Sequence, residues 1–350
     1  MTISTDLDIL YPVQGVEGTS VHAQETTDQS PSRTSYRTFL ASGCSRDLAF
    51  AESVYREWDR LDNKHRTSQF LQCKSAAWFV VHRKTREVRV QSHSCGLRWC
   101  PFCIRSRRYV ITSSVAEWLK GRKRPRFVTL TLRHRSAPLS EQIQDLYYFF
   151  RQLRKTSFWR SNVRGGIWFF QVKKTKSGEY WHPHLHVLVE GNYMEQEHLR
   201  ELWRKITNGS YIVDIRAIKS VRKAAAYVAR YASAPCRLLD CDFADALEVV
   251  QALHGKRICG TFGSAKGVPL RKLPYDDRED WVTLDSFFNV SLGSSTDDIA
   301  ATIWQCWIDN KPYTGKLPQP PPDLHERFKA EQTRSVTFNQ MFFEYFDNPL

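Results

Sequence analysis

The segment 165–191 constrains the fold of this chain most strongly. Two runs rich in apolar residues, GGIWFFQVKKT and HLHVLVEG, flank a short polar stretch that contains Gly178. Runs of this kind around a glycine turn predict an antiparallel β-hairpin. Apart from its histidines and one glutamate the second run is apolar, which indicates an interior strand, where polar side chains need a reason. The sequence therefore predicts a sheet built around this hairpin.

Helical and strand patterns alternate around the hairpin. Apolar residues recur at helical spacing on one side of several segments, whereas other segments alternate like strands. This order predicts an α+β fold, with a central antiparallel or mixed sheet and helices packed on one of its faces. The expected helices lie at 46–66, 139–156, 195–207 and 222–232, and further strands are expected at 127–134 and 211–218.

The charge balance indicates a polyanionic partner. The 350 residues include 51 Lys and Arg against 37 Asp and Glu, a formal net charge of +14. Nucleic acid is the commonest partner of such a chain, although a merely basic protein remains an alternative.

We find no apolar run near the roughly 20 residues of a membrane span and no secretory leader pattern, so we expect a cytoplasmic protein without a membrane partner. We also find no phosphate-loop motif, so a helicase would have to be another protein.

Nine cysteines, three of them clustered, suggest a structural metal site. Cys95, Cys100 and Cys103 have the spacing of a zinc knuckle, and a tetrahedral zinc needs a fourth ligand. Cys73 is the expected fourth ligand because a hairpin between it and the cluster would fold it back, and His93 is the second choice. Reduced, unliganded thiols are the alternative.

Two histidines within the hairpin form a candidate metal site. Residues two apart on a strand face the same side, so His184 and His186 present two imidazoles to one point. Two imidazoles at this spacing can bind one divalent metal ion. The competing interpretation is a histidine cluster on an exposed edge.

A third pattern lies on the helix expected at 222–232. Tyr227 and Tyr231 are four residues apart, which brings their hydroxyls to one helix face, with Arg230 beside them. Taken alone, such a pair is more typical of core packing.

Together, three motifs resemble a known family. The segments FVTLT at 127–131, HPHLHV at 182–187 and YVARY at 227–231 follow the order found in the His-hydrophobic-His (HUH) endonucleases that initiate rolling-circle replication of plasmids and single-stranded DNA phages. The YVARY segment is most similar to the two-tyrosine branch, although the usual lysine three residues after the first tyrosine is an arginine here.

The resemblance implies an activity and its site. Tyrosine would attack one DNA strand at the origin, form a 5′-phosphotyrosine intermediate and later rejoin strands. The catalytic residues would be Tyr227, Tyr231 and Arg230, with Tyr227 favoured for the first cleavage because only it has a basic residue three positions on. A Mg²⁺ or Mn²⁺ ion would be held by His184, His186 and, from the preceding strand, Gln171.

The same resemblance implies partners and leaves alternatives. The partners would be single-stranded origin DNA, a host helicase and a host DNA polymerase. A two-tyrosine transposase uses the same chemistry on transposon ends, and a non-enzymatic, zinc-containing nucleic-acid-binding protein is a rival from another class.

Four regions follow from these patterns. We expect a disordered tail at 1–45, a helix with a zinc-binding basic subdomain at 46–126 and an HUH-like catalytic domain at 127–270. The region 271–350 is aromatic and contains prolines, and no chemistry is assigned to it. Nine Arg and Lys between 95 and 126 are expected to contact phosphates; they are residues 98, 105, 107, 108, 120, 122, 123, 124 and 126.

Overall fold

The structure, a computed structural model, describes residues 7–10, 35–41, 43–175, 177–271 and 280–318. The described residues fall into two compact units. The larger contains 7–10, 35–77 and 91–271, and the smaller contains 78–90 and 280–318. The expected subdomain 46–126 is therefore shared between two units, since residues 78–90 group with the C-terminal region.

A five-stranded sheet forms the centre of the larger unit. Its strand order is β7-β4-β6-β5-β8, and each neighbouring pair is antiparallel. The expected hairpin is present, with Gly178 at a positive φ of 79° in its turn. The strands are β4 (Arg126–Thr131), β5 (Val163–Lys174), β6 (Trp181–Gly191), β7 (Val213–Ala217) and β8 (Cys259–Gly263).

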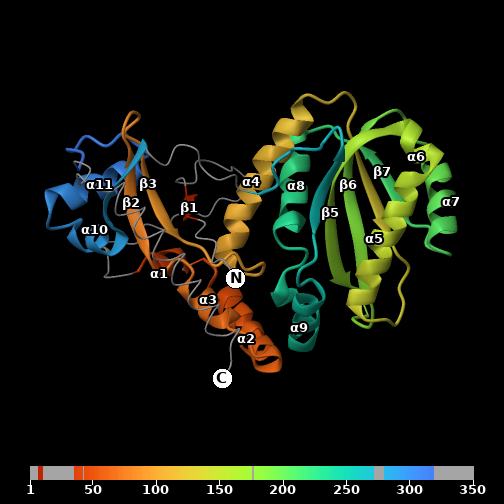
Figure 1. Ribbon diagram of the computed structural model, residues 1–350, viewed down its shortest axis with the longest axis horizontal. Coiled ribbons are helices and arrows are strands. Elements are labelled where there is room, and N and C mark those ends of the chain that lie inside the picture. Colours follow the sequence, from red (N-terminus) through yellow and green to blue (C-terminus); the bar gives the residue numbers. More distant parts are fainter. Residues whose placement is uncertain (1–6, 11–34, 42, 176, 272–279, 319–350) are drawn as a thin grey trace, which may run out of the picture. The chain divides into compact units, whose positions relative to one another are not determined.

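Helices cover both faces of this sheet (Figure 1). On one face lie α5 (Leu139–Lys155), α6 (Ser157–Asn162) and α7 (Gln196–Ile206). The opposite face is covered by α4 (Pro101–Lys120) and α8 (Val221–Ser233). The α+β class with an antiparallel sheet is confirmed, but the expectation of helices on one face is wrong.

The reason lies in the composition of β5. Phe169 packs with α4 and α8, whereas its neighbour Phe170 packs with α5, and both are fully buried. Because successive side chains of a strand point to opposite faces, a run that is apolar at every position requires cover on both sides.

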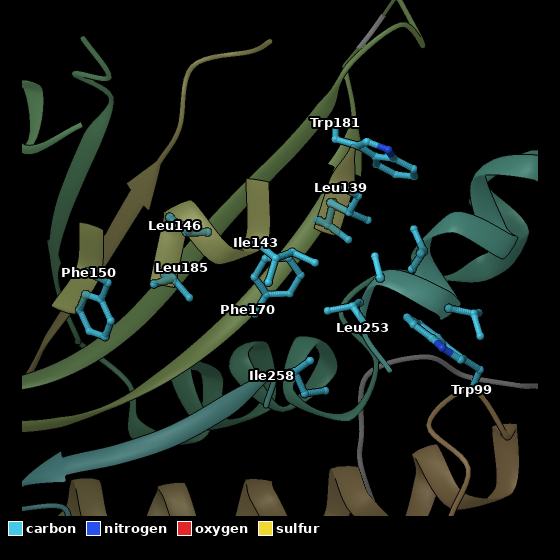
Figure 2. Close-up of a cluster of buried hydrophobic side chains, with 14 of the residues drawn as sticks. Trp99, Leu139, Ile143, Leu146, Phe150, Phe170, Trp181, Leu185, Leu253 and Ile258 are labelled. Carbon is cyan, nitrogen blue, oxygen red and sulfur yellow. The ribbon is translucent and has the colours of Figure 1, made fainter. Parts of the chain in front are cut away.

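The core beneath α5 depends on helical spacing. Leu139, Ile143, Leu146 and Phe150 recur every three or four residues and form one buried stripe. Figure 2 shows this stripe against Phe170 and neighbouring side chains of the same core. The hydrophobic effect on this stripe holds α5 to the sheet.

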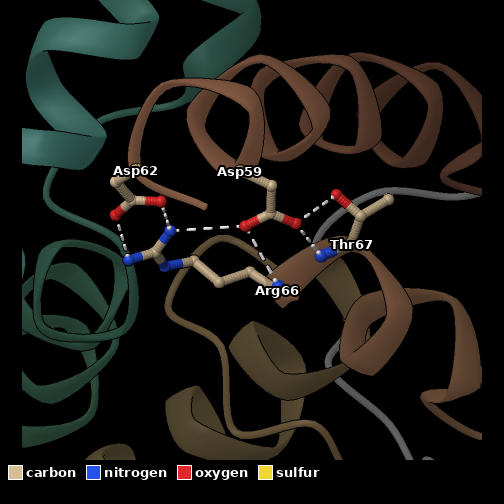
Figure 3. A network of polar contacts seen from close by, with 4 residues as sticks. All are labelled: Asp59, Asp62, Arg66 and Thr67. Carbon is tan, nitrogen blue, oxygen red and sulfur yellow. Dashed lines mark hydrogen bonds and ion pairs between the residues drawn. The ribbon is translucent and has the colours of Figure 1, made fainter. Parts of the chain in front are cut away.

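A partly buried ion-pair network joins α2 (Ser45–Asp62) to α3 (Arg66–Gln72) (Figure 3). Asp59 accepts hydrogen bonds from the backbone N–H and hydroxyl of Thr67, both at 2.7 Å, and from the Arg66 N–H at 3.1 Å. The Arg66 guanidinium bridges Asp59 and Asp62. Asn63 ends α2 in the left-handed region, with φ 51°, so that the chain turns back.

The remaining elements of this unit are β1 (Leu7–Leu10), α1 (Tyr36–Ala41), the 3₁₀ helix Leu238–Asp240 and α9 (Phe243–Ala252).

The smaller unit brings together segments that are far apart in sequence. From Trp78 onward, β2 (Ala77–His82) pairs antiparallel with β9 (Trp281–Ser286), and β3 (Val88–His93) lies on the other side of β2. Two helices follow β9, namely α10 (Phe287–Gly293) and α11 (Asp298–Ile308). An aromatic cluster packs within this unit and consists of Phe79, Phe287, Trp304 and Trp307.

Parts of two expected regions lie outside the described residues. In the expected tail, the structure describes β1, α1 and residues 43–45. From the region 271–350 it omits 272–279 and 319–350. Among the helices that are described, none combines the length and apolar character needed to cross a membrane.

The Asp59 network gives a stability prediction. Asp59→Ala leaves the Thr67 and Arg66 donors without their acceptor, and partial burial limits how far water can replace it. We expect the free energy of unfolding to fall by about 1–3 kcal/mol, measured by urea denaturation.

The matched control is Glu52→Ala, which removes an exposed ion pair with Arg56. That change is expected to cost less than about 0.5 kcal/mol. Burial acts to raise the pKa of Asp59, but hydrogen bonds from Thr67 and Arg66 outweigh it and hold the pKa below its ordinary value. The contribution of Asp59 is therefore present at neutral pH and is lost as pH falls through this lowered pKa. Equal losses for both variants would contradict the role of the network.

Candidate functional site

The two histidines lie on the buried face of β6 that α8 covers. His184 is 6% exposed and His186 is 4% exposed. The strand register places Gln171 of β5 directly opposite His184, and Thr129 of β4 directly opposite His186. Residues paired in this way share a face of the sheet, so all four side chains meet at one point.

Gln171 joins the two imidazoles. Its Oε1 lies 2.7 Å from His186 Nε2 and also contacts His184 Nε2. The Nδ1 atom of His184 lies 3.1 Å from the backbone carbonyl of His182, so Nδ1 carries the ring proton. The Nε2 atom of His184 then offers a lone pair to the same place as the amide oxygen. Lone pairs that converge without a proton between them are a donor set suited to a cation.

Burial keeps these imidazoles neutral. Desolvation lowers the pKa of His184 to about 3 and that of His186 to about 4, with charge repulsion as the smaller cause. A neutral imidazole is the form that binds a metal ion. Two imidazole nitrogens and an amide oxygen therefore fit a divalent cation such as Mn²⁺ or Mg²⁺.

Both tyrosines of α8 face this cluster. The ring of Tyr227 is 5.6 Å from that of His186, the ring of Tyr231 is 5.4 Å from it, and the two phenol rings are 5.2 Å apart. The fully buried Ala225 and Ala229 let the helix pack closely on the sheet. The predicted helical face is therefore present.

Arg230 lies beside both phenols. Its guanidinium carbon is 5.2 Å from the Tyr227 ring centre and 5.9 Å from the Tyr231 ring centre. Burial and a hydrogen bond to Tyr231 raise the pKa of Tyr227 to about 12. A phenol with this pKa needs nearby positive charge to act as a nucleophile at neutral pH.

The four expected cysteines form one cluster. The sulfur atoms of Cys73, Cys95, Cys100 and Cys103 all lie within 4.8 Å of one another. Three Sγ–Sγ distances are 3.6 to 3.7 Å, close to the edge of about 3.8 Å of a tetrahedron with Zn–S bonds of about 2.3 Å. This cluster could bind a metal such as zinc.

Backbone pairing brings Cys73 to the knuckle. The Lys74 N–H donates to the His93 carbonyl at 2.9 Å, and the Cys95 N–H points to Cys73 Sγ at 3.5 Å. Hydrogen bonds from Cys100, Cys73 and Cys95 hold the pKa of Cys103 below its ordinary value. The alternative ligand, His93, is not part of the cluster.

The basic block divides into two kinds of residue. Arg98 donates to the carbonyls of Leu253 and Lys256, and Arg107 donates to those of Leu97, Arg98 and Ser233, so both guanidinium groups bind the protein itself. Arg122 and Arg126 also donate to backbone carbonyls, those of Trp118 and Asn192. The exposed members are Arg105, Arg108, Lys120, Lys123 and Arg124.

Sequence reasoning missed the contribution of Thr129 and the proximity of Arg108 to Arg230. Thr129 Oγ1 lies 3.3 Å from His186 Nδ1 and orients that ring. Arg108 of α4 lies near Arg230. The pKa of Arg108 is lowered, first by partial desolvation and second by the positive charge of Arg230. The FVTLT motif contains Thr129, but only the strand register assigns it to His186.

A family model described as replication protein matches residues 86–307 of this chain. This span includes the β4, β6 and α8 motifs and three of the four clustered cysteines. The chain belongs to the replication protein family. The resemblance to replication initiators is thereby confirmed at the level of the family.

Curated relatives agree with this membership. Protein rep of Streptococcus pneumoniae serotype 2 (strain D39 / NCTC 7466) is 29% identical over 45% of this chain and 57% of its own length. Protein rep of a Bacillus sp is 27% identical over the same shares, and that of Staphylococcus aureus is 25% identical over 42% of this chain and 71% of its own length. The chain thus spans little more than half of the first two relatives. No solved structure matches the chain.

The cysteine cluster gives a second prediction. Purified protein is expected to contain about one tightly held metal ion per chain, and Cys100→Ser is expected to lose it together with folded stability, because the metal joins segments distant in sequence. Metal analysis after dialysis and thermal unfolding measure both effects.

Cys306→Ser is the matched control, because Cys306 lies outside the cluster and donates to the Pro312 carbonyl. It should keep the metal. Metal-free wild-type protein that is folded and freshly reduced would refute the site.

Proposed function

We propose that this replication protein initiates rolling-circle replication by nicking one DNA strand at an origin through a tyrosine. One observation carries the proposal: His184, His186 and Gln171 converge within ring contact of Tyr227 and Tyr231. A nucleophile beside a cation-binding donor set is what phosphodiester cleavage requires.

The residues divide the chemistry between them. The phenol oxygen of one tyrosine attacks the scissile phosphorus, the bond from phosphorus to the 3′ oxygen breaks, and that oxygen leaves as a 3′ hydroxyl after taking a proton. The product is a 5′-phosphotyrosine diester, so rejoining by the reverse reaction needs no ATP. Arg230 offers positive charge to the transferring phosphate.

A divalent metal ion would be held by the two imidazoles and Gln171. When bound, it supplies Lewis-acid charge that polarises the phosphate. Thr129 and the His182 carbonyl orient the imidazole rings toward that place. We propose Mg²⁺ or Mn²⁺ here, and a structural zinc on the four cysteines.

The partners follow from this activity. Origin DNA would be the substrate, the 3′ hydroxyl would prime a host polymerase, and a host helicase would open the duplex, all in the cytoplasm. A two-tyrosine transposase acting on transposon ends and a zinc-containing DNA-binding protein without activity remain the alternatives, and cleavage of a single-stranded origin oligonucleotide excludes the latter.

The histidines give the third prediction. His184→Ala and His186→Ala should abolish nicking of a single-stranded oligonucleotide, with DNA binding nearly unchanged because most phosphate contacts lie on basic residues elsewhere. Gln171→Ala should raise the Mn²⁺ concentration needed, since two ligands remain. Gel assays over a metal titration measure both.

The exposed His198 of α7 provides the control. It stacks on Phe158, away from the cluster, so His198→Ala should leave nicking unchanged. Full cleavage in excess EDTA would refute the metal-dependent mechanism.

The tyrosines give the fourth prediction. Tyr→Phe removes only the hydroxyl and keeps ring packing. Arg230 lies nearer the Tyr227 ring, so Tyr227→Phe should reduce the first covalent protein–DNA adduct more than Tyr231→Phe does. Denaturing gels of 3′-labelled substrate measure the adduct.

The double variant is the decisive control. It should form no adduct at all while remaining folded, as checked by circular dichroism. Adduct that survives in the double variant would exclude tyrosine as the nucleophile.

A further inference from the structure

A cleft opens at the β8 edge of the sheet, with Tyr147 and Trp168 on the face opposite the histidines and Val268 packing with the core beneath α4 and α8. Its volume is about 730 Å³, and its walls come from α5, β5, β8 and the loop before β8. Trp168 of β5 lines it, and this side chain alternates with the Phe169 and Gln171 side chains that face α8. The cleft is therefore separate from the site formed by His184, His186 and Gln171.

Positive charge dominates this cleft. No acidic side chain from the described part of the chain lines it. Arg151 and Arg257 are exposed, and Arg154 is half-buried over the Phe150 and Phe262 rings, with its pKa lowered by burial. Among the described residues, none of the cleft cations forms an ion pair with a carboxylate. These cations are Arg98, Arg151, Arg154, Lys256, Arg257 and Arg271.

Aromatic rings lie between these charges. Tyr147 and Trp168 are half-buried, and their ring centres are 5.3 Å apart. Gly260 pairs with Trp168 across the strands, and a Cβ at Gly260 would lie 2.7 Å from the indole nitrogen. Glycine at this position leaves the indole room beside the cleft.

The wall of the cleft is already fixed by hydrogen bonds. Arg98 donates to the carbonyls of Leu253 and Lys256, both at 2.6 Å, and the Tyr147 hydroxyl donates to the Arg257 carbonyl. A preformed wall lowers the ordering cost of binding.

We propose that this cleft binds single-stranded DNA, as a second contact apart from the cleavage site; the inference rests on the proposal that the chain acts on DNA. Unneutralised cations attract the phosphates, and the aromatic rings offer surfaces on which unpaired bases stack. Bases within a duplex are already stacked, so the aromatic wall favours a single strand.

The test measures binding without cleavage. The full chain is titrated against a fluorescent 30-nucleotide oligo-dT in EDTA, and anisotropy is followed. Arg151→Glu combined with Arg257→Glu reverses two exposed cations of the cleft. We expect the affinity to fall about 10- to 100-fold at low salt, and the slope of log K against log salt to weaken by about 0.7 for each lost phosphate contact.

Arg160→Glu combined with Lys205→Glu is the matched control. It changes the net charge equally at exposed residues of α6 and α7 outside the cleft. We expect less than about a threefold loss. Equal losses for the two double variants would overturn the proposal, and so would an equal loss of duplex affinity in the cleft variant.

Cross-linking gives a second readout. A bromodeoxyuridine oligonucleotide, irradiated on the wild-type protein, should cross-link to Tyr147 or Trp168, and cross-links confined to other elements would overturn the proposal. A His184→Ala protein that fails to nick but still cross-links in the cleft supports it. If no metal or DNA condition gives nicking by wild-type protein while cleft binding persists, the nicking proposal fails and this one stands.

Discussion

The register between β5 and β6 is the constraint on which the site depends. It sets Gln171 opposite His184 and Phe169 opposite His186, so one amide oxygen reaches two imidazoles on a buried face. A slip of one residue would turn Gln171 away from that face and bring Phe170 in its place. Apolar residues alternate with the polar groups, as Phe170 does with Gln171. They oppose the slip because it would turn Gln171 into the apolar core beneath α5 and take Phe170 out of it. The hydrophobic pattern thus positions the polar chemistry.

Local sequence patterns predicted most helices and strands, whereas they did not predict which distant strands pair. The hairpin, the helix bearing Tyr227 and the place of Cys73 in the cysteine cluster follow from neighbouring residues, turn chemistry and cysteine spacing. The strand β8, by contrast, is not among the strands that the sequence predicts, and β9 pairs with β2 across some two hundred residues. The sequence of one strand does not identify the strand that pairs with it, since backbone hydrogen bonds are the same for every sequence. The presence of helices on both sheet faces was not predicted for a related reason. Phe169 and Phe170 are the same residue type, and only their alternate positions on the strand direct them to opposite faces.

The candidate site shows the same division. Imidazole spacing on a strand and phenol spacing on a helix were predictable, because each lies within one element. Whether the two elements meet depends on α8 packing on the sheet, which rests on Ala225 and Ala229 and on the apolar residues beneath them. The hydrogen bonds of Arg98 were not predictable, since a guanidinium in the sequence does not show whether backbone carbonyls already accept from it. Here two of them do.

The strand β5 links the two proposed DNA contacts. Trp168 faces the basic cleft and Gln171 faces the imidazoles, three residues further along, a distance of about 10 Å at roughly 3.3 Å per residue. Between Gly165 and Phe169, β5 is paired on both sides, with β6 and β8, so it cannot shift without breaking two ladders of hydrogen bonds. The two faces therefore keep a fixed separation. A single strand of DNA that occupied both proposed contacts would therefore be held on the two faces of one rigid sheet.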